Sequence, residues 1–226
     1  MRAAHKIQSG RLYTVAEYLE FERQAEERHE YLDGVIRAMA GESPTHGDIN
    51  VNLLGELRAQ LKDKPCRVIS ANTKIRSGHP IAQTRQSKGL FSYADASVVC
   101  EERKYLDKHQ DVLLNPTVVF EILSPSTESF DRGEKFWRYR AHLESLTDYV
   151  LISQAYPLVE HYRRQADGQW LLNPISGLDG VLKIDSIDCS LPLAELYYGV
   201  EFPALKKTKA KPKAKKAKKQ KSAKKG

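Results

Sequence analysis

Thr117-Val-Val-Phe-Glu-Ile-Leu-Ser-Pro125 is the stretch that decides the fold. It has the pattern of a short apolar strand with one carboxylate, Glu121, in its middle. An ionised carboxylate is rarely buried without a partner, because its desolvation is costly unless a cation or hydrogen bonds offset it. The strand therefore predicts either a structural ion pair at Glu121 or a site that binds a cation.

A second strand with the same pattern lies upstream. Tyr93-Ala-Asp95-Ala-Ser-Val-Val-Cys100 places an acid, Asp95, at the head of an otherwise apolar run. Two such strands side by side would bring both carboxylates together. Oxygen ligands on rigid strands, with room for water and a phosphate, are typical of Mg²⁺ sites. The alternative for Asp95 is a buried ion pair or a hydrogen bond at the strand end.

The rest of the chain shows short strands separated by helices, which predicts an α/β fold. Helices are expected over residues 14–27, after a capping box at Thr14 and Glu17, and from Ser43 onward. A polar loop over 78–92 is expected near the site. Strands are expected over residues 35–39, 67–76, 93–100, 117–123, 149–153, 182–187 and 191–196, and in a hairpin over 158–172 that turns at Asp167-Gly168.

Charged residues follow the strand that carries Glu121. Asp131 and Glu134 are spaced as an N-cap pair, so a helix is expected to begin near Arg132. Lys135 then falls in the first turn, where a cation opposes the helix dipole. A carboxylate site would offset that charge, and the ammonium group could orient a water or stabilise a pentavalent phosphorane. The alternative is a solvated helix lysine.

In their order and spacing, these residues resemble the Uma-two family of restriction endonucleases, a branch of the PD-(D/E)XK nuclease superfamily. The resemblance covers nearly all of residues 13–202. It rests on Glu30-Tyr-Leu-Asp33-Gly34, Met39-Ala-Gly-Glu-Ser-Pro-Thr-His46, Asp95, Pro116 to Thr127, Asp131, Lys135 and Tyr139. It implies a restriction-endonuclease-like mixed central β-sheet flanked by helices. It also implies hydrolysis of phosphodiester bonds in nucleic acid, with DNA as the expected substrate and Mg²⁺ or Mn²⁺ as cofactor.

The resemblance also assigns the site. Asp95 and Glu121 correspond to the acids of the two catalytic strands and would hold the metal. The lysine expected two residues after the second acid is absent, since Leu123 stands there, and its role passes to Lys135. The proline usual before the first acid is replaced by Ala94, which should alter strand entry more than metal binding.

Two upstream residues match family positions as well. Glu30, expected at the end of the first helix, corresponds to an extra acid that holds a metal-bound water or a second ion. The alternative is an exposed glutamate at a helix end. His46 could donate to a phosphate or shuttle a proton, since its unperturbed pKa lies near 6.5. Capping or a hydrogen bond in the core would explain it equally well.

The charge is divided unevenly along the chain. The net charge is +7, but residues 204–226 contain twelve lysines and no acid, which leaves −5 for the remainder. Such a segment cannot bury apolar surface and is expected to be disordered. It would bind phosphate backbones without sequence preference, unless it is only a solubilising tail. The lysines expected to do so are Lys211, Lys213, Lys215, Lys216, Lys218 and Lys219.

The chain is expected to divide into a flexible N-terminus (1–12), one nuclease-like domain (13–203) and the disordered tail (204–226). No apolar run approaches the roughly 18 residues that a membrane helix needs, and no secretory signal is recognisable. Cys66, Cys100 and Cys189 are odd in number and far apart, which favours reduced thiols over disulfides or a zinc site. No membrane contact and a cytoplasmic location are therefore expected. A homodimer is expected only from the habit of related nucleases.

The sequence thus predicts a Mg²⁺-dependent endonuclease. A protein with the nuclease fold that binds nucleic acid or a protein partner without cutting is the alternative, because fold does not determine function. A third hypothesis makes the tail dominant, in a general binder of nucleic acid or other polyanions.

Overall fold

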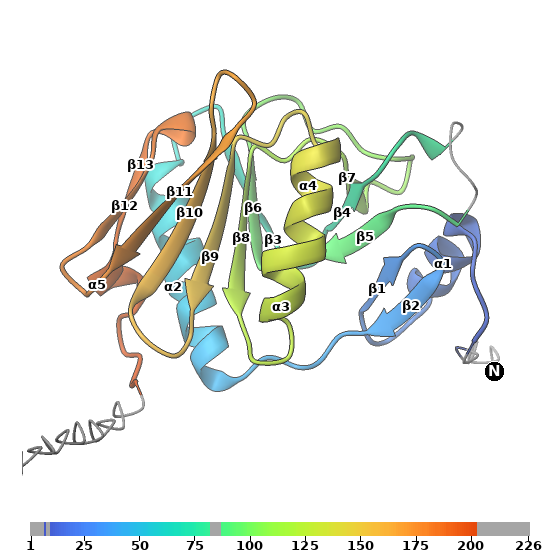
Figure 1. Cartoon of the computed structure of the whole chain (residues 1–226), viewed down its shortest axis with the longest axis horizontal. Coiled ribbons are helices and arrows are strands. Elements are labelled where there is room, and N and C mark those ends of the chain that lie inside the picture. The colour runs from blue at the N-terminus through green and yellow to red at the C-terminus, as the bar shows by residue number, and fades with distance from the viewer. Residues whose placement is uncertain (1–6, 8–9, 82–86, 203–226) are drawn as a thin grey trace, which may run out of the picture.

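The computed structural model describes residues 7, 10–81 and 87–202 (Figure 1). The tail and its lysines lie outside the described residues, as do most of the first nine positions and part of the predicted polar loop. Within the described part of the chain, no helix is both long and apolar enough to cross a lipid bilayer.

Helices and strands alternate along the chain. The helical segments are α1 (Val15–Glu22), α2 (Pro44–Gln60), α3 (Glu128–Phe130), the π-helical turn η2 (Asp131–Lys135), α4 (Phe136–His142), the 3-10 turn η3 (Asp185–Ile187) and α5 (Leu193–Leu196). The strands are β1 (His29–Leu32), β2 (Val35–Ala38), β3 (Arg67–Ser70), β4 (Lys74–Ser77), β5 (Leu90–Tyr93), β6 (Ala96–Val99), β7 (Val112–Leu113), β8 (Val118–Leu123), β9 (Asp148–Ser153), β10 (Leu158–Arg164), β11 (Trp170–Ser176), β12 (Val181–Ile184) and β13 (Cys189–Pro192).

Among the described residues, the strands form two mixed sheets and one separate pair. The five-stranded sheet has the order β2-β1-β5-β4-β7, the six-stranded sheet has the order β11-β10-β9-β8-β6-β3, and β12 pairs with β13. Adjacent strands are antiparallel except β4 with β7 and β8 with β9, which are parallel. The predicted mixed α/β fold flanked by helices is confirmed, with its strands shared between two sheets.

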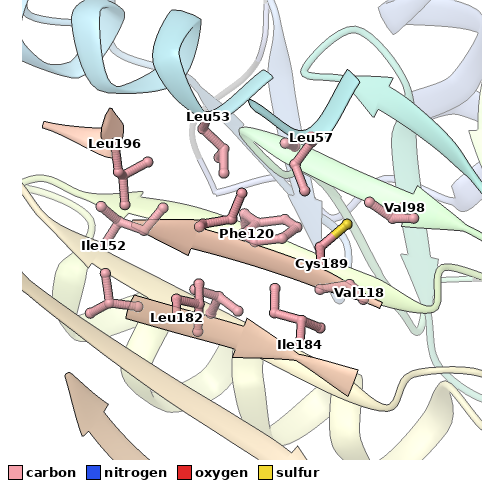
Figure 2. Close-up of a cluster of buried hydrophobic side chains, with 14 of the residues drawn as sticks. Leu53, Leu57, Val98, Val118, Phe120, Ile152, Leu182, Ile184, Cys189 and Leu196 are labelled. Carbon is pink, nitrogen blue, oxygen red and sulfur yellow. The ribbon is translucent and has the colours of Figure 1, made fainter. Parts of the chain in front are cut away.

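One face of the six-stranded sheet carries the apolar core (Figure 2). Helix α2 buries Ile49, Leu53 and Leu57, whose spacing of four residues places them on one helix face. They pack against a cluster that includes Val118 and Phe120 of β8 together with β12, β13 and α5. This layer fixes α2, and therefore His46 in its first turn, against β8.

The opposite face of that sheet is covered by α4. Phe136 and Tyr139 of the helix pack on Val119, Leu123 and neighbouring residues of β9. Because β8 is buried on both faces, its sequence is apolar at nearly every position instead of alternating. Glu121 is the one acid in that run, and it shares the α4 face with Val119 and Leu123.

Two predicted strands are each divided between the sheets. The run expected over 67–76 forms β3 in the six-stranded sheet and β4 in the five-stranded sheet. The run expected over 93–100 likewise divides into β5 and β6, with Ala94 and Asp95 between them. The prediction of single strands was wrong, because the breaks at 71–73 and 94–95 contain Asn72 and Asp95, which are poor strand formers. The second crossover places Asp95 where the two sheets meet.

Several local predictions are confirmed, and others need correction. Thr14 and Ser43 cap α1 and α2, and Gly168 adopts a φ of +82° in the β10–β11 turn. Helix α1 ends at Glu22 instead of residue 27, because the chain then turns into β1. The strand expected over 191–196 ends at Pro192 and continues as α5, whose apolar residues face the core.

The prediction of reduced thiols was wrong for two of the three cysteines. Cys66 and Cys100 form a disulfide with a Cα–Cα distance of 3.8 Å. The cause is register: Arg67 pairs with Val99 in antiparallel β3 and β6, so the next residue on each side lies opposite the other. Among the described residues Cys189 is free and buried in the core, as a packing role requires. The cysteine count therefore no longer supports a cytoplasmic location.

Candidate active site

Asp95 and Glu121 lie side by side, as the two strand patterns predict. Strands β6 and β8 are antiparallel with Ala96 opposite Phe120, so the residue before Ala96 lies beside the residue after Phe120. Asp95 Oδ2 accepts a hydrogen bond of 2.6 Å from the backbone N–H of Ile122. The predicted strand-end hydrogen bond thus exists, and it holds the Asp95 carboxylate beside Glu121.

Lys135 reaches Glu121 from the helix above the sheet. Its Nζ lies 2.8 Å from Glu121 Oε1, and both side chains are only 4% exposed. The ammonium group also donates to Asp131 Oδ1 at 3.3 Å and to the Tyr93 carbonyl at 3.4 Å. Glu30 Oε1 is 3.7 Å away. One lysine thus contacts three carboxylates, and we call these four residues, Glu30, Glu121, Asp131 and Lys135, the site cluster.

The helix that carries Lys135 does not begin where its sequence predicts. It starts at Glu128 and passes through the π-helical turn η2 before α4. Asp131 is therefore not an N-cap residue, and Lys135 lies inside a helix instead of in its first turn. The Ser124-Pro-Ser-Thr127 turn leads directly into the helix at Glu128, three residues before Asp131. The π turn places Asp131 and Lys135 on the same buried side, and such turns are frequent at functional sites.

Glu30 approaches from the other sheet. It lies on β1, not at the end of the first helix, so the predicted exposed helix-end position was wrong. The Glu30 side chain is 18% exposed. Strand β1 forms a hairpin with β2 through the Asp33-Gly34 turn, where both residues have positive φ. Glycine is favoured at position 34 because a Cβ added there would lie 3.1 Å from the Cβ of Leu12.

Glu121 contains a polar atom that the protein leaves unsatisfied. Although Lys135 Nζ is close to Glu121 Oε1, the contact lacks hydrogen-bond geometry, and within the described residues this buried oxygen has no hydrogen-bond partner. Buried oxygens without partners are rare in folded proteins and costly. Among the described residues, the ion pair with Lys135 is therefore the contact that offsets the burial of this oxygen.

The pKa directions in the site cluster reflect burial first and an excess of acid second. Burial raises the pKa of Glu121 well above its ordinary value, and the charges of Asp131 and Asp95 add to this although Lys135 opposes it. Burial also raises the pKa of Glu30, against the effect of Lys135. Burial would lower the pKa of Lys135, but the surrounding carboxylates raise it overall. The lysine stays charged, and the acids still lack enough positive charge.

His46 completes the site on the side of Asp95. Its Nε2 lies 2.8 Å from Asp95 Oδ1, and Ser43, the N-cap residue of α2, accepts from the His46 backbone N–H. The Gln154 amide group donates to His46 Nδ1 at 3.4 Å and to the Leu123 carbonyl at 2.9 Å. With Nδ1 accepting, Nε2–H is the donor to Asp95. Burial lowers the pKa of His46, but the bond to Asp95 and its charge raise it overall.

All five residues predicted for the site lie in this region. His46 contacts Asp95, which lies beside Glu121, and Lys135 contacts both Glu121 and Glu30. Sequence reasoning missed Asp131 and Gln154 as members. The spacing of Asp131 and Lys135 by four residues was a usable signal, because such residues share a helix face. Gln154 follows β9, which pairs with β8, and nothing in its local sequence marks it.

The donor set fits a small, hard cation with few protein ligands. Within residues 7, 10–81 and 87–202, no three histidine, cysteine, aspartate or glutamate side chains form a group that could hold a metal ion. Mg²⁺ keeps several waters and is commonly bound by only one or two carboxylates. The unsatisfied Glu121 Oε1 beside Asp95 supplies such a pair of oxygen ligands.

With this geometry established, comparison with known proteins places the chain. A family model named Uma2, described as "Putative restriction endonuclease", matches residues 15–194. The chain belongs to this family. The match spans every element from α1 to the start of α5, including all the residues of the site. Membership supports nuclease activity in general terms.

Curated relatives and a solved structure agree. Two uncharacterized proteins of Synechocystis sp. are similar to the chain. One is 36% identical over 186 residues, which cover 82% of this chain and 92% of the relative. The other is 33% identical over 171 residues, which cover 76% and 92%. A solved structure from Anabaena variabilis, described as "a putative nuclease belonging to DUF820", has a TM-score of 0.65 at 18% identity and covers 82% of this chain and 97% of that one. At that identity the match shows the fold alone.

Proposed function

We propose that this protein is a metal-dependent endonuclease that hydrolyses phosphodiester bonds of DNA. The observation that carries the proposal is the site cluster itself, where one buried lysine contacts three carboxylates and Glu121 Oε1 still lacks a hydrogen bond. A cluster built only for stability would balance its charges and satisfy its oxygens. Excess acid beside a buried lysine suits a site that receives a cation and a phosphate.

Each residue has a proposed role. Asp95 and Glu121 would hold Mg²⁺ or Mn²⁺, which when bound supplies Lewis-acid activation of a phosphoryl oxygen and of a water. Lys135 stabilises charge that develops on the phosphoryl group. Glu30 orients water near Lys135. His46 holds Asp95 in position through Nε2 and is placed to donate to a phosphate or to move a proton.

The reaction is a balanced hydrolysis. The oxygen of water forms a bond to phosphorus, and one ester P–O bond breaks. The water loses a proton to solvent or to a site base, and the leaving oxygen gains one. Residues 13–203 form the catalytic domain in this proposal, and the lysines of residues 204–226 add affinity for phosphate backbones that the acidic remainder lacks. The protein acts as a homodimer where both strands are cut.

Cleavage of supercoiled plasmid by the full chain tests the proposal. We expect cleavage with Mg²⁺ or Mn²⁺ and none with EDTA. Glu121→Gln and Asp95→Asn should each lower the cleavage rate by at least about 10²-fold. Each variant removes a carboxylate charge that is proposed to hold the metal ion, and with it the stabilisation of charge in the transition state. Glu128→Gln is the matched control, since Glu128 is an exposed acid on the same helical segment outside the site cluster. It should cleave like the unmodified chain.

Two outcomes would reject the proposal. Cleavage that persists in Glu121→Gln at the control rate would remove Glu121 from catalysis. Absence of cleavage by the unmodified chain, together with no heat of Mg²⁺ or Mn²⁺ binding in calorimetry, would favour a protein with the nuclease fold that binds without cutting.

A further inference from the structure

The outer side of the helical segment that carries Lys135 borders an open pocket of about 420 Å³. Its wall is formed by η2 and α4, and its far side by β10. The residues that bear on its chemistry are Arg132, Gly133, Phe136, Trp137, Arg140 and Tyr162. None of them belongs to the site cluster, and Lys135 points to the other side of the same helix.

The pocket is lined by aromatic rings. The Phe136 and Tyr162 rings are tilted by 48° with centroids 4.5 Å apart, and Phe136 meets Trp170 edge-on at 5.3 Å. Trp137, by contrast, is 50% exposed at the pocket wall. A half-exposed tryptophan beside the buried Phe136 ring and the partly buried Tyr162 ring offers a flat surface for another planar group.

Positive charge accompanies the rings. The Arg140 guanidinium lies 5.6 Å from the Phe136 ring centroid, and among the described residues Arg140 has no carboxylate partner. Glu134 also lines the pocket and pairs with Arg138 at 2.6 Å, and Glu160 pairs with Arg132. Among the described residues that line the pocket, Arg140 is therefore the cation without a carboxylate partner, and it can meet an anionic ligand.

Gly133 provides an independent observation. It lies inside a helical segment, where glycine is less favourable than alanine. A Cβ built at Gly133 would meet no atom within 4 Å, so packing of the protein does not require glycine there. Glycine is used where a backbone must be approached closely by a ligand. Since Gly133 lines the pocket, its missing side chain keeps the wall open.

From these features we propose that the pocket binds an unpaired base of a nucleic-acid strand, stacked on Trp137, with an adjoining phosphate at Arg140. This deepens, and rests on, the proposed function. Stacking on aromatic rings together with arginine contacts is how proteins hold single strands without reading sequence. The helix that separates the pocket from Glu121 is about 10–12 Å across.

Tryptophan fluorescence tests this directly, because the chain has two tryptophans. In Trp170→Phe, Trp137 is the remaining reporter, and the native chain serves as a second sample if that variant does not fold. The full chain is titrated in EDTA with hexathymidylate and with an abasic hexamer of the same phosphate count. We expect quenching by hexathymidylate only. Phosphate binding by lysines elsewhere gives no such signal.

Matched glycine variants complete the test. Gly133→Ala should weaken the affinity for hexathymidylate, measured by quenching, about tenfold or more, as the loss of one stacked base does. Gly55→Ala, at an exposed helical glycine on α2 whose added Cβ also meets nothing within 4 Å, should leave it unchanged. Equal quenching by the abasic hexamer, or unchanged titration in Gly133→Ala, would overturn the proposal. Equal quenching by thymidine 5′-monophosphate at the same concentration would assign the pocket to free nucleotides and overturn it too.

The two proposals fail separately. Quenching by hexathymidylate in a protein that never cleaves with Mg²⁺ would reject the catalytic function and leave the base-binding pocket standing. Cleavage without quenching would reject the pocket alone.

Discussion

Two charged clusters in this protein treat their acids in opposite ways. The site cluster sets Glu30, Glu121 and Asp131 against one lysine. A second group, the outer cluster, consists of Arg23, Lys74, Asp107 and Asp111 and joins α1, β4 and the segment before β7. Arg23 contacts Asp107 at 2.7 Å and Asp111 at 2.9 Å, and Lys74 contacts Asp111 at 3.1 Å. Two cations there face two acids.

The pKa directions follow that balance. Burial would raise the pKa of Asp111, but hydrogen bonds from Arg23 and Lys74 lower it to about 2. A hydrogen bond from Arg23 likewise lowers the pKa of Asp107. In the site cluster, burial raises the pKa of Glu121 and Glu30 despite Lys135. The outer cluster therefore satisfies itself, whereas the site cluster is arranged for a charge that comes from outside.

The largest expected effect is the loss of the site lysine. Lys135→Met leaves three carboxylates around an apolar side chain, and removing one partner of a buried ion pair costs about 3–5 kcal/mol. Urea denaturation at pH 7 measures the free energy of unfolding. Lys74→Met is the matched control, and its loss should be smaller because Arg23 still pairs with Asp111. An equal loss of unfolding free energy in both variants would mean that the two clusters do not differ in their balance of acids and cations.

A smaller, pH-dependent effect is expected in the outer cluster. The folded pKa of Asp111, about 2, lies below the ordinary aspartate value of 3.8, so ionisation of Asp111 stabilises the fold above that ordinary value. This contribution is lost as pH falls from about 4 to about 2. Asp111→Asn should therefore cost about 1–2 kcal/mol at pH 7, reduced for partial exposure, and almost nothing near pH 2. Denaturation across pH measures it, and a cost that does not change with pH would contradict the assignment.

The smallest expected effect has the opposite sign. Because the folded pKa of Glu121 is raised, its ionisation opposes folding above the ordinary pKa of a glutamate. Glu121→Gln should raise the free energy of unfolding at pH 7 by about 1 kcal/mol. Unlike the loss of Lys135, this change leaves no charge unpaired, because Lys135 keeps Asp131 and Glu30 as partners. The gain should vanish below about pH 4, where the acid is protonated in both states. Thermal unfolding at both pH values measures this, and destabilisation at pH 7 would place Glu121 among structural ion pairs.

Local sequence patterns predict part of this site well. Glu121 and Asp95 stand out because each is an acid in an apolar strand, and the register of β6 and β8 then brings them together. The caps at Thr14 and Ser43 depend on the side chains of neighbouring residues, so they too are visible in the sequence. Lys135 could be assigned only through the family resemblance, which supplied a reason to look for a displaced lysine.

Features that depend on distant contacts could not be predicted. Asp95 is a poor strand former, but which sheet each half of the run joins depends on its pairing partners, β4 and β1 for β5 and β3 and β8 for β6. The π turn that buries Asp131 and Lys135 was not visible in the sequence, where Asp131 and Glu134 are spaced as an N-cap pair. The disulfide of Cys66 and Cys100 follows from strand register across a separation of 34 residues. In each case the deciding partner lies far along the chain.

A crystal structure with Mn²⁺ tests the central claim most directly. With Mn²⁺ at a concentration that supports cleavage, we expect an anomalous peak within about 2.5 Å of carboxylate oxygens of both Asp95 and Glu121. The same soak of Glu121→Gln should show the peak lost or strongly reduced. Crystals with no Mn²⁺ at these two carboxylates, or with Mn²⁺ bound only elsewhere, would contradict the account.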